Sequence, residues 1–136
     1  MKSVLILCTG NSCRSVMAEA LVNHLRAGQY KAVSAGSNPA GYVHPKSLET
    51  LQTHGVAMAN PRSKSWDEFA GQHFDAVITV CDQAASESCP VFLGPCQKLH
   101  WSTPDPANAK GSEQEIDTAF EEAFQMLKQR IQEELL

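Results

Sequence analysis

The sequence predicts a single α/β domain in which a central, mostly parallel four-stranded sheet is flanked by helices in a three-layer sandwich. Short aliphatic segments alternate along the chain with segments of helical spacing, which is typical of βαβ units. The 136 residues have the usual size of one domain, so residues 1–136 are expected to form one unit. The hydrophobic fraction of 43% is too high for a disordered chain.

The N-terminal half supplies two strands and two helices. Aliphatic runs indicate the strands, apolar residues three or four positions apart indicate the helices, and glycines end the segments. The expected elements are a strand over Lys2–Leu7, a helix over Ser15–Ala27, a strand over Tyr30–Ala35 and a helix from Pro45 to Gly55.

The C-terminal half completes the sheet and adds a long helix. The expected elements are a short helix over Trp66–Ala70, strands over Phe74–Val80 and Gln97–Trp101, and a final helix with Ile116, Phe120, Phe124, Leu127 and Ile131 on one face. Ligands of parallel sheets bind beyond the carboxyl ends of the strands. Cys8 and Cys81 each follow a strand, so both sulfurs are expected at the functional edge of the sheet.

Composition excludes several classes of partner. The net charge is −4 and no dense run of Lys and Arg occurs, so a nucleic-acid partner is not expected. No apolar run is long enough to span a membrane, and the four aliphatic residues near the N-terminus are too few for a signal peptide. We therefore expect a cytoplasmic protein without a membrane partner.

The segment from Cys8 to Ser15 has the features of an anion-binding loop. It links a strand to a helix, so its backbone N–H groups and the helix N-terminus can converge on one anion. Gly10 and Asn11 tolerate the positive φ that a tight loop needs. Arg14 offers a planar fork to two oxygens, and the positive surroundings favour a nucleophilic thiolate at Cys8. The expected oxyanion-binding residues are Thr9, Gly10, Asn11, Ser12, Cys13, Arg14 and Ser15.

Asp105 is the candidate general acid. Pro104 and Pro106 flank it and would hold its carboxyl group rigidly. An oxygen leaving group needs a proton donor at neutral pH. Without the anion loop, an aspartate between two prolines would indicate an ordinary surface turn.

The anion loop and the Asp-Pro step together resemble the low-molecular-weight protein tyrosine phosphatases and the arsenate reductases that share their fold. The resemblance extends over nearly the whole chain. It implies that Cys8 is the nucleophile, that Arg14 binds the oxyanion and that Asn11 keeps the loop in shape. It implies that Asp105 is the acid, whereas Cys13 is interpreted as a small residue filling the loop.

The remaining cysteines favour a reductase. The segment that starts at Cys81 and continues to Cys89-Pro90 resembles the redox segment of the arsenate reductases. It implies that Cys81 attacks the sulfur of Cys8 and that Cys89 then receives the disulfide, with Cys96 as an ordinary loop cysteine. Reducing equivalents would come from thioredoxin or from glutathione and glutaredoxin, with no bound cofactor. A zinc site of Cys81, Cys89, Cys96 and His100 lacks the short spacing of zinc ligands, so no metal is expected.

The first functional hypothesis is therefore reduction of arsenate, a small oxyanion of which phosphate and sulfate are analogues. The alternative is a tyrosine phosphatase that uses the same residues with water. Ala107 and Asn108 follow the Asp-Pro step where such phosphatases carry aromatic residues, although Tyr42 or Trp66 could supply an aromatic wall. A sensor that binds arsenicals without turnover would not need Asp105.

Lys64 marks a departure from some relatives. Certain arsenate reductases of this fold hold a potassium ion beside the loop, using residues that match Asn11, Glu19 and Ser34 together with an aspartate. Lys64 occupies the position of that aspartate. A lysine ammonium near Glu19 would replace the ion.

Overall fold

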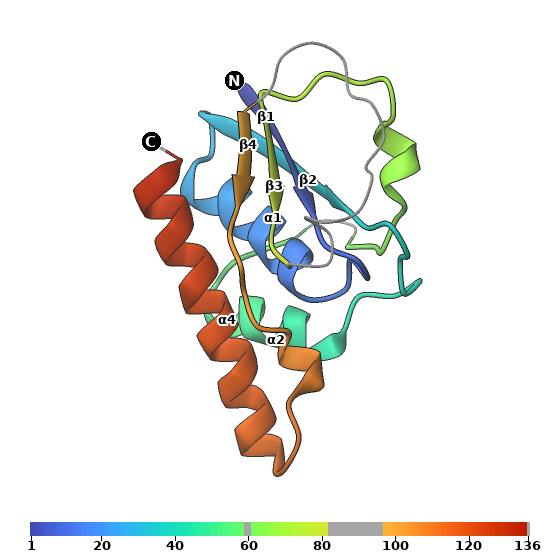
Figure 1. Cartoon of the computed structure of the whole chain (residues 1–136). Helices are drawn as coiled ribbons and strands as arrows, with labels where there is room; N and C mark the ends of the chain where they lie inside the picture. Colours follow the sequence, from blue (N-terminus) through green and yellow to red (C-terminus); the bar gives the residue numbers. More distant parts are fainter. Residues whose placement is uncertain (59–60, 82–96, 136) are drawn as a thin grey trace.

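The computed structural model describes residues 1–58, 61–81 and 97–135 (Figure 1). Its strands are β1 (Lys2–Leu7), β2 (Tyr30–Ala35), β3 (Ala76–Thr79) and β4 (Gln97–His100). Its helices are α1 (Arg14–Leu25), α2 (Pro45–Thr53) and α4 (Glu113–Glu134), with short 3₁₀ turns η1 (Trp66–Phe69) and η2 (Pro106–Asn108). Within these ranges, every helix is too short or too polar to cross a membrane.

The four strands form one parallel sheet in the order β2-β1-β3-β4, which confirms the predicted α/β fold. The central strand β1 pairs with both neighbours, and Leu7 lies opposite Ala35 on one side and Thr79 on the other. All three strands therefore end at the same edge, where Cys8 continues from β1 and Cys81 follows β3.

Side chains of β1 alternate between two hydrophobic clusters. Val4 and Ile6 face the larger cluster, which the helices α1, α2 and α4 complete (Figure 1). Leu5 and Leu7 face the smaller cluster, to which η1 contributes Trp66. Both faces of the central strand are thus covered, as the continuous aliphatic run predicted.

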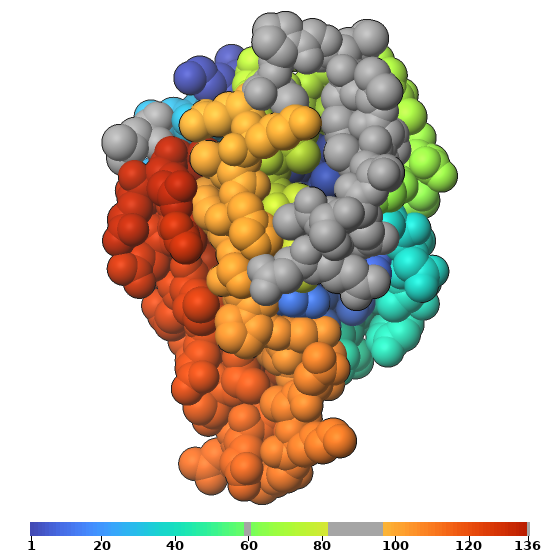
Figure 2. Space-filling model, viewed as in Figure 1, coloured from blue at the N-terminus to red at the C-terminus, as the bar shows by residue number. Residues whose placement is uncertain are grey.

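The segment between β4 and α4 carries Asp105 and packs against α4. The space-filling view shows the orange residues around β4 and η2 packed against the red helix α4 (Figure 2). The helix begins with Ser112 as its N-cap, whose Oγ accepts a hydrogen bond from the Glu115 backbone N–H at 3.2 Å and donates one to the Glu115 carboxylate. Phe120, Phe124 and Leu127 are buried along one face, as predicted.

Element boundaries differ slightly from the predicted ones. The third strand is shorter than the predicted Phe74–Val80 and covers Ala76–Thr79, although Val80 N–H still donates to Leu7 O at 3.0 Å. The first helix begins at Arg14 rather than Ser15, because Met17 N–H already bonds to the carbonyl of Cys13 at 3.0 Å. Such shifts of one or two residues are usual where hydrogen-bonded ladders fray.

Gly36 packs directly under the anion loop. It follows β2 and bonds through its backbone N–H to Lys64 O and through its carbonyl to Trp66 N–H, each at 2.9 Å. A Cβ atom here would lie 2.4 Å from Thr9 O and 2.6 Å from Cys8 O. Backbone on both sides leaves no flexible side chain to yield, so the position accepts only glycine.

Replacement of Gly36 by alanine is therefore expected to destabilise the protein by about 1–3 kcal/mol, the usual cost of overpacking. Urea unfolding followed by circular dichroism measures this. Gly10→Ala is the matched control, since its Cβ would meet only Ser12 Oγ at 3.9 Å. Equal destabilisation by the two substitutions would contradict the steric explanation.

Candidate active site

The loop after β1 turns its carbonyl oxygens outward. Thr9 O accepts a hydrogen bond from Asn38 N–H at 3.0 Å, and Gly10 O accepts one from Ala40 N–H at 2.9 Å. Ser12 O accepts hydrogen bonds from His44 N–H and Ser47 Oγ, and Ser63 Oγ donates a second bond to Gly10 O. The surrounding chain thus satisfies the acceptors of the loop.

This arrangement points the loop's donors inward. In a trans peptide the carbonyl of one residue and the N–H of the next point in opposite directions, and the described chain has no cis peptide. The N–H groups of Gly10, Asn11 and Cys13 therefore face the centre of the loop. The Gly10 N–H already donates to the sulfur of Cys8. The predicted convergence of backbone donors is present.

Asn11 holds the tightest turn of the loop. It has φ of +47°, the one positive value at a non-glycine residue among those described, and its side chain is fully buried. Its amide nitrogen donates to Ser15 Oγ at 2.8 Å and to Ser34 Oγ at 3.0 Å. Its amide oxygen accepts from Lys64 N–H at 2.9 Å. Three neighbouring segments therefore fix this strained residue.

A buried ion pair between Lys64 and Glu19 lies next to Asn11. Lys64 Nζ lies 3.6 Å from Glu19 Oε1, and the two side chains are only 9% and 13% exposed. Ser34 Oγ donates to the same carboxylate oxygen at 2.8 Å. The predicted proximity of Lys64 and Glu19 is confirmed, and their charges compensate each other where an isolated charge would be costly.

Arg14 and Asp105 face each other across the mouth of the loop. Arg14 Nη2 lies 3.4 Å from Asp105 Oδ2, while Nη1 donates to Thr103 O at 3.0 Å. Asp105 Oδ1 also accepts from Ala107 N–H at 3.0 Å, which makes Asp105 the N-cap of η2. The aspartate is thus a turn residue and a neighbour of the oxyanion site at once.

Cys81 lies against Cys8. The two thiols are hydrogen-bonded, and each residue is 4% exposed. Thr9 holds Cys81 from the other side, since its backbone N–H donates to Cys81 Sγ at 3.4 Å and its hydroxyl lies 3.6 Å from the same sulfur. The structure therefore brings together the two sulfurs that the sequence assigned only to a common sheet edge.

The thiol contact outweighs the positive loop in setting the ionisation of Cys8. The hydrogen bond with the Cys81 side chain raises the pKa of the Cys8 thiol well above its ordinary range, and burial raises it further. The charge of Arg14 and the Gly10 N–H lower the pKa without cancelling this rise. The predicted effect of the loop is therefore present, because Arg14 and the Gly10 N–H both favour the thiolate, but the contact with Cys81 and burial act against it.

Cys13 is buried within the same loop. Burial raises the pKa of its thiol above the ordinary value, while hydrogen bonds with Ser12 and Ser47 lower it. Its sulfur lies 3.6 Å from Ser12 Oγ. These contacts fit the predicted role of a small residue that fills the loop.

Two neighbouring hollows lie over these residues. The inner one has a volume of about 40 Å³ and is lined by Cys8, Gly10, Asn11, Ser12, Cys13, Arg14 and Asp105. The outer one has about 620 Å³ and is lined by Thr9, Gly10, Arg14, Cys81, Ser102, Thr103, Pro104, Asp105 and Asn108. Among the described residues, neither lining includes an aromatic side chain. Tyr42 is exposed, and Trp66 packs into the smaller core cluster.

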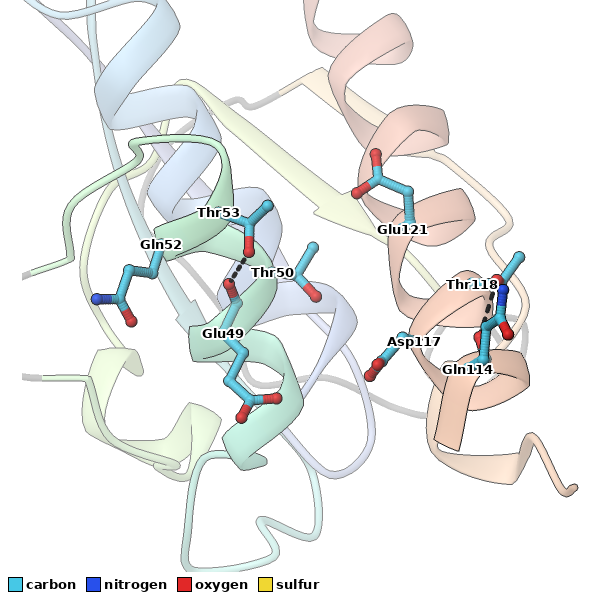
Figure 3. Close-up of a pocket in the computed structure, with 8 residues that line it drawn as sticks. All are labelled: Glu49, Thr50, Gln52, Thr53, Gln114, Asp117, Thr118 and Glu121. Atoms are coloured by element: carbon cyan, nitrogen blue, oxygen red, sulfur yellow. Dashed lines mark hydrogen bonds between the residues drawn. The ribbon is translucent and has the colours of Figure 1, made fainter. Parts of the chain in front are cut away.

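A further cleft of about 640 Å³ separates α2 from α4, and several of its polar side chains already have partners (Figure 3). The hydroxyls of Thr53 and Thr118 donate to carbonyls of their own helices. Lys46 Nζ lies 2.6 Å from Asp117 Oδ1, and these contacts hold the pKa of Lys46 above its usual value. The cleft is a groove between two helices in which several polar groups are already hydrogen-bonded, and it offers no second reaction centre.

Some candidate residues from the sequence are not part of the described site. Cys89 and Cys96 lie outside the described residues, so their predicted roles are untested. His100 Nδ1 lies 2.7 Å from Thr79 Oγ1. Ser47 and Ser63, which bind loop carbonyls, were missed because nothing in the local sequence connects them with a loop more than 30 residues away.

The chain resembles known proteins over almost its full length. Residues 3–135 match the model of the low molecular weight phosphotyrosine protein phosphatase family. A protein named arsenate reductase from Bacillus subtilis (strain 168) is 33% identical over 132 residues, which are 97% of this chain and 94% of that protein.

Solved structures agree with the sequence comparison. A structure described as an arsenate reductase in the phosphate binding state has a TM-score of 0.77 and 28% identity, with 98% of this chain and 95% of that chain covered. A thioredoxin-dependent arsenate reductase from Corynebacterium glutamicum has a TM-score of 0.65 and 28% identity, with 97% and 62% covered. The fold and the loop after β1 lead to the same conclusion as these matches: the chain belongs to the low molecular weight phosphotyrosine protein phosphatase family.

Proposed function

We propose that this protein is an arsenate reductase in which Cys8, Arg14, Asp105 and Cys81 act together. The observation that carries the proposal is the hydrogen-bonded pair of thiols at the base of an anion loop. A relative named arsenate reductase with 33% identity over nearly the whole chain supports the same activity. The substrate is a small oxyanion, in keeping with the inner hollow of about 40 Å³.

In the first step the sulfur of Cys8 forms a bond to arsenic and one arsenate oxygen leaves as water. The loop N–H groups and the Arg14 guanidinium bind the remaining oxygens, where they stabilise charge without reorganising. Asp105 delivers a proton to the departing oxygen, and the proton released from the Cys8 thiol replaces it. A thiol and a protonated oxyanion thus give a sulfur–arsenic adduct and water.

In the second step Cys81 attacks the sulfur of Cys8. A sulfur–sulfur bond forms, and the electron pair of the sulfur–arsenic bond remains on arsenic, which leaves as trivalent arsenite. The proton of Cys81 passes to the released arsenite. The hydrogen bond between the thiols supports this step, because the attacking sulfur needs no large movement to reach its target.

The alternative is a phosphatase that hydrolyses the Cys8 adduct with water. Membership of a phosphatase family and the shared loop favour it. Hydrolysis, however, needs a water molecule where a second thiol is held against Cys8 by Thr9. The described linings of both hollows also offer no aromatic wall for an aryl phosphate.

Reducing equivalents come from a dithiol protein of the thioredoxin type. The structural relative from Corynebacterium glutamicum is thioredoxin-dependent, which supports this choice over glutathione and glutaredoxin. Cys89 then attacks Cys81 and presents the resulting disulfide to the reductant. The reaction takes place in the cytoplasm. An NADPH-coupled assay with arsenate, run in parallel with thioredoxin and with glutathione plus glutaredoxin, tests the assignment beside a p-nitrophenyl phosphate control.

Cys81→Ser is expected to stop the reaction at the Cys8 adduct, since serine cannot supply the second sulfur. Arsenate-dependent NADPH oxidation should fall to background, whereas hydrolysis of p-nitrophenyl phosphate should persist. Cys96→Ser serves as the control and should reduce arsenate like the wild type. Sustained arsenate turnover by Cys81→Ser would rule out its role as the attacking thiol.

Asp105→Asn is expected to lower kcat by about 10²–10⁴-fold, the usual cost of losing a general acid, with little change in KM. Steady-state kinetics with arsenate measure both constants. Asp67→Asn, at an exposed carboxylate of η1, controls for loss of charge. A raised KM with unchanged kcat would instead make Asp105 a binding residue.

The Lys64–Glu19 ion pair is expected to make the enzyme insensitive to potassium, because the ammonium already neutralises Glu19 beside Asn11. Activity should be equal in sodium and potassium buffers of the same ionic strength. Lys64→Asp should create potassium activation, and Lys98→Asp, at an exposed residue of β4, should not. Potassium activation of the wild type would show that the ammonium does not replace a cation.

A further inference from the structure

We propose that the reduced protein chelates trivalent arsenic between the sulfurs of Cys8 and Cys81, forming a dead-end complex with its own product. The two thiols form a preassembled pair, and soft thiolate ligands favour soft electrophiles. The regulatory meaning rests on the proposed function, which makes arsenite the product. The chelation itself depends only on the pair of sulfurs.

The fold supplies the geometry of the chelate. Cys8 directly follows the buried strand β1 and is hydrogen-bonded to Cys81, so the sulfurs already lie within bridging reach of one atom. Thr9 restrains Cys81 through its N–H at 3.4 Å and its hydroxyl at 3.6 Å. Both cysteine side chains are therefore already ordered, so a ligand that bridges the two sulfurs costs little conformational entropy.

The chemistry is a balanced exchange without a redox step. Arsenous acid carries three hydroxyl groups, and two of them leave as water with the protons of the two thiols. Two sulfur–arsenic bonds form, arsenic stays trivalent and one hydroxyl remains on it. No reductant or oxidant is consumed.

The route to the sulfurs suits an uncharged ligand. Arsenous acid is neutral at pH 7 and does not need the anion loop. Cys81 and Thr9 line the outer hollow of about 620 Å³, and Cys8 lines the inner hollow of about 40 Å³. Gly10, Arg14 and Asp105 line both hollows, so the two hollows are neighbours.

The second thiol makes binding much stronger than one thiol alone. Once arsenic is bonded to one sulfur, the other attacks at an effective concentration set by the fold, which typically raises affinity by about 10²–10⁴-fold. In the unfolded chain 72 intervening residues separate the two sulfurs, so the closure entropy of that loop weakens the bridge. Binding should therefore raise the unfolding temperature of the reduced protein.

The test uses arsenite and phenylarsine oxide as probes on the fully reduced chain, without oxygen and after removal of small thiols. Isothermal titration gives affinity and stoichiometry, and a thiol assay counts the free sulfurs. Cys89→Ser/Cys96→Ser is the background, so that only Cys8, Cys13 and Cys81 can bind. The expected result is one arsenical per chain, loss of two free thiols and a raised unfolding temperature.

Single substitutions then assign the sulfurs. Cys8→Ser and Cys81→Ser should each weaken binding by about 100-fold or more, whereas Cys13→Ser should retain it. The Cys8–Cys81 disulfide form should not bind at all. Circular dichroism confirms that each variant is folded, and Cys81→Ala repeats the test without the serine hydroxyl.

Equal affinity for wild type and Cys81→Ser, or loss of tight binding in Cys13→Ser or in the Cys89→Ser/Cys96→Ser background, would overturn the inference. Arsenate turnover, measured separately, distinguishes it from the proposed function. A protein that chelates arsenite but does not reduce arsenate keeps the inference and loses the function. A protein that reduces arsenate but does not bind arsenite tightly keeps the proposed function and overturns the inference.

Discussion

The outward orientation of three loop carbonyls is the constraint on which the site depends. An oxyanion can occupy the loop only if the oxygens of Thr9, Gly10 and Ser12 point away from it. Each oxygen receives hydrogen bonds from the chain between Asn38 and Ser47, and Ser63 adds one to Gly10. The segments around the sheet edge thus convert a short loop into a rigid set of inward donors, at the cost of one strained residue, Asn11.

The sequence predicted the sheet and the helices because their signals are local. Aliphatic runs and helical spacing need no information from distant residues, and they identified the four strands and three long helices of the described residues with small errors at the ends. The same logic assigned Cys8 and Cys81 to one edge, since parallel strands end together. The ionisation of Cys8 could not be predicted this way, because it depends on a contact between sulfurs 73 positions apart.

What distinguishes a reductase from a hydrolase on this loop is the group that stands opposite the nucleophile. Both chemistries need the inward donors, an arginine and an acid. Hydrolysis then needs water aligned with the Cys8 adduct, whereas reduction needs a sulfur that can accept a bond from the Cys8 sulfur itself. The N–H of Thr9 donates to the sulfur of Cys81, and the Thr9 hydroxyl lies 3.6 Å from the same sulfur. In the proposed mechanism the loop would therefore help to hold the attacking thiol as well as the substrate.

The same closeness creates a conflict between catalysis and product release. Sulfurs near enough to form a disulfide are also near enough to share one arsenic atom, so no distance favours the first and forbids the second. In the proposed mechanism the order of events resolves this conflict within a single turnover, because arsenite is formed in the step that joins Cys8 to Cys81. Once the disulfide has formed, neither Cys8 nor Cys81 has a free thiol with which to bind the arsenite. The thiols return only when a reductant opens the disulfide, so rebinding of arsenite depends on how much of it remains nearby. Turnover in a protein built this way is sensitive to removal of its product from solution.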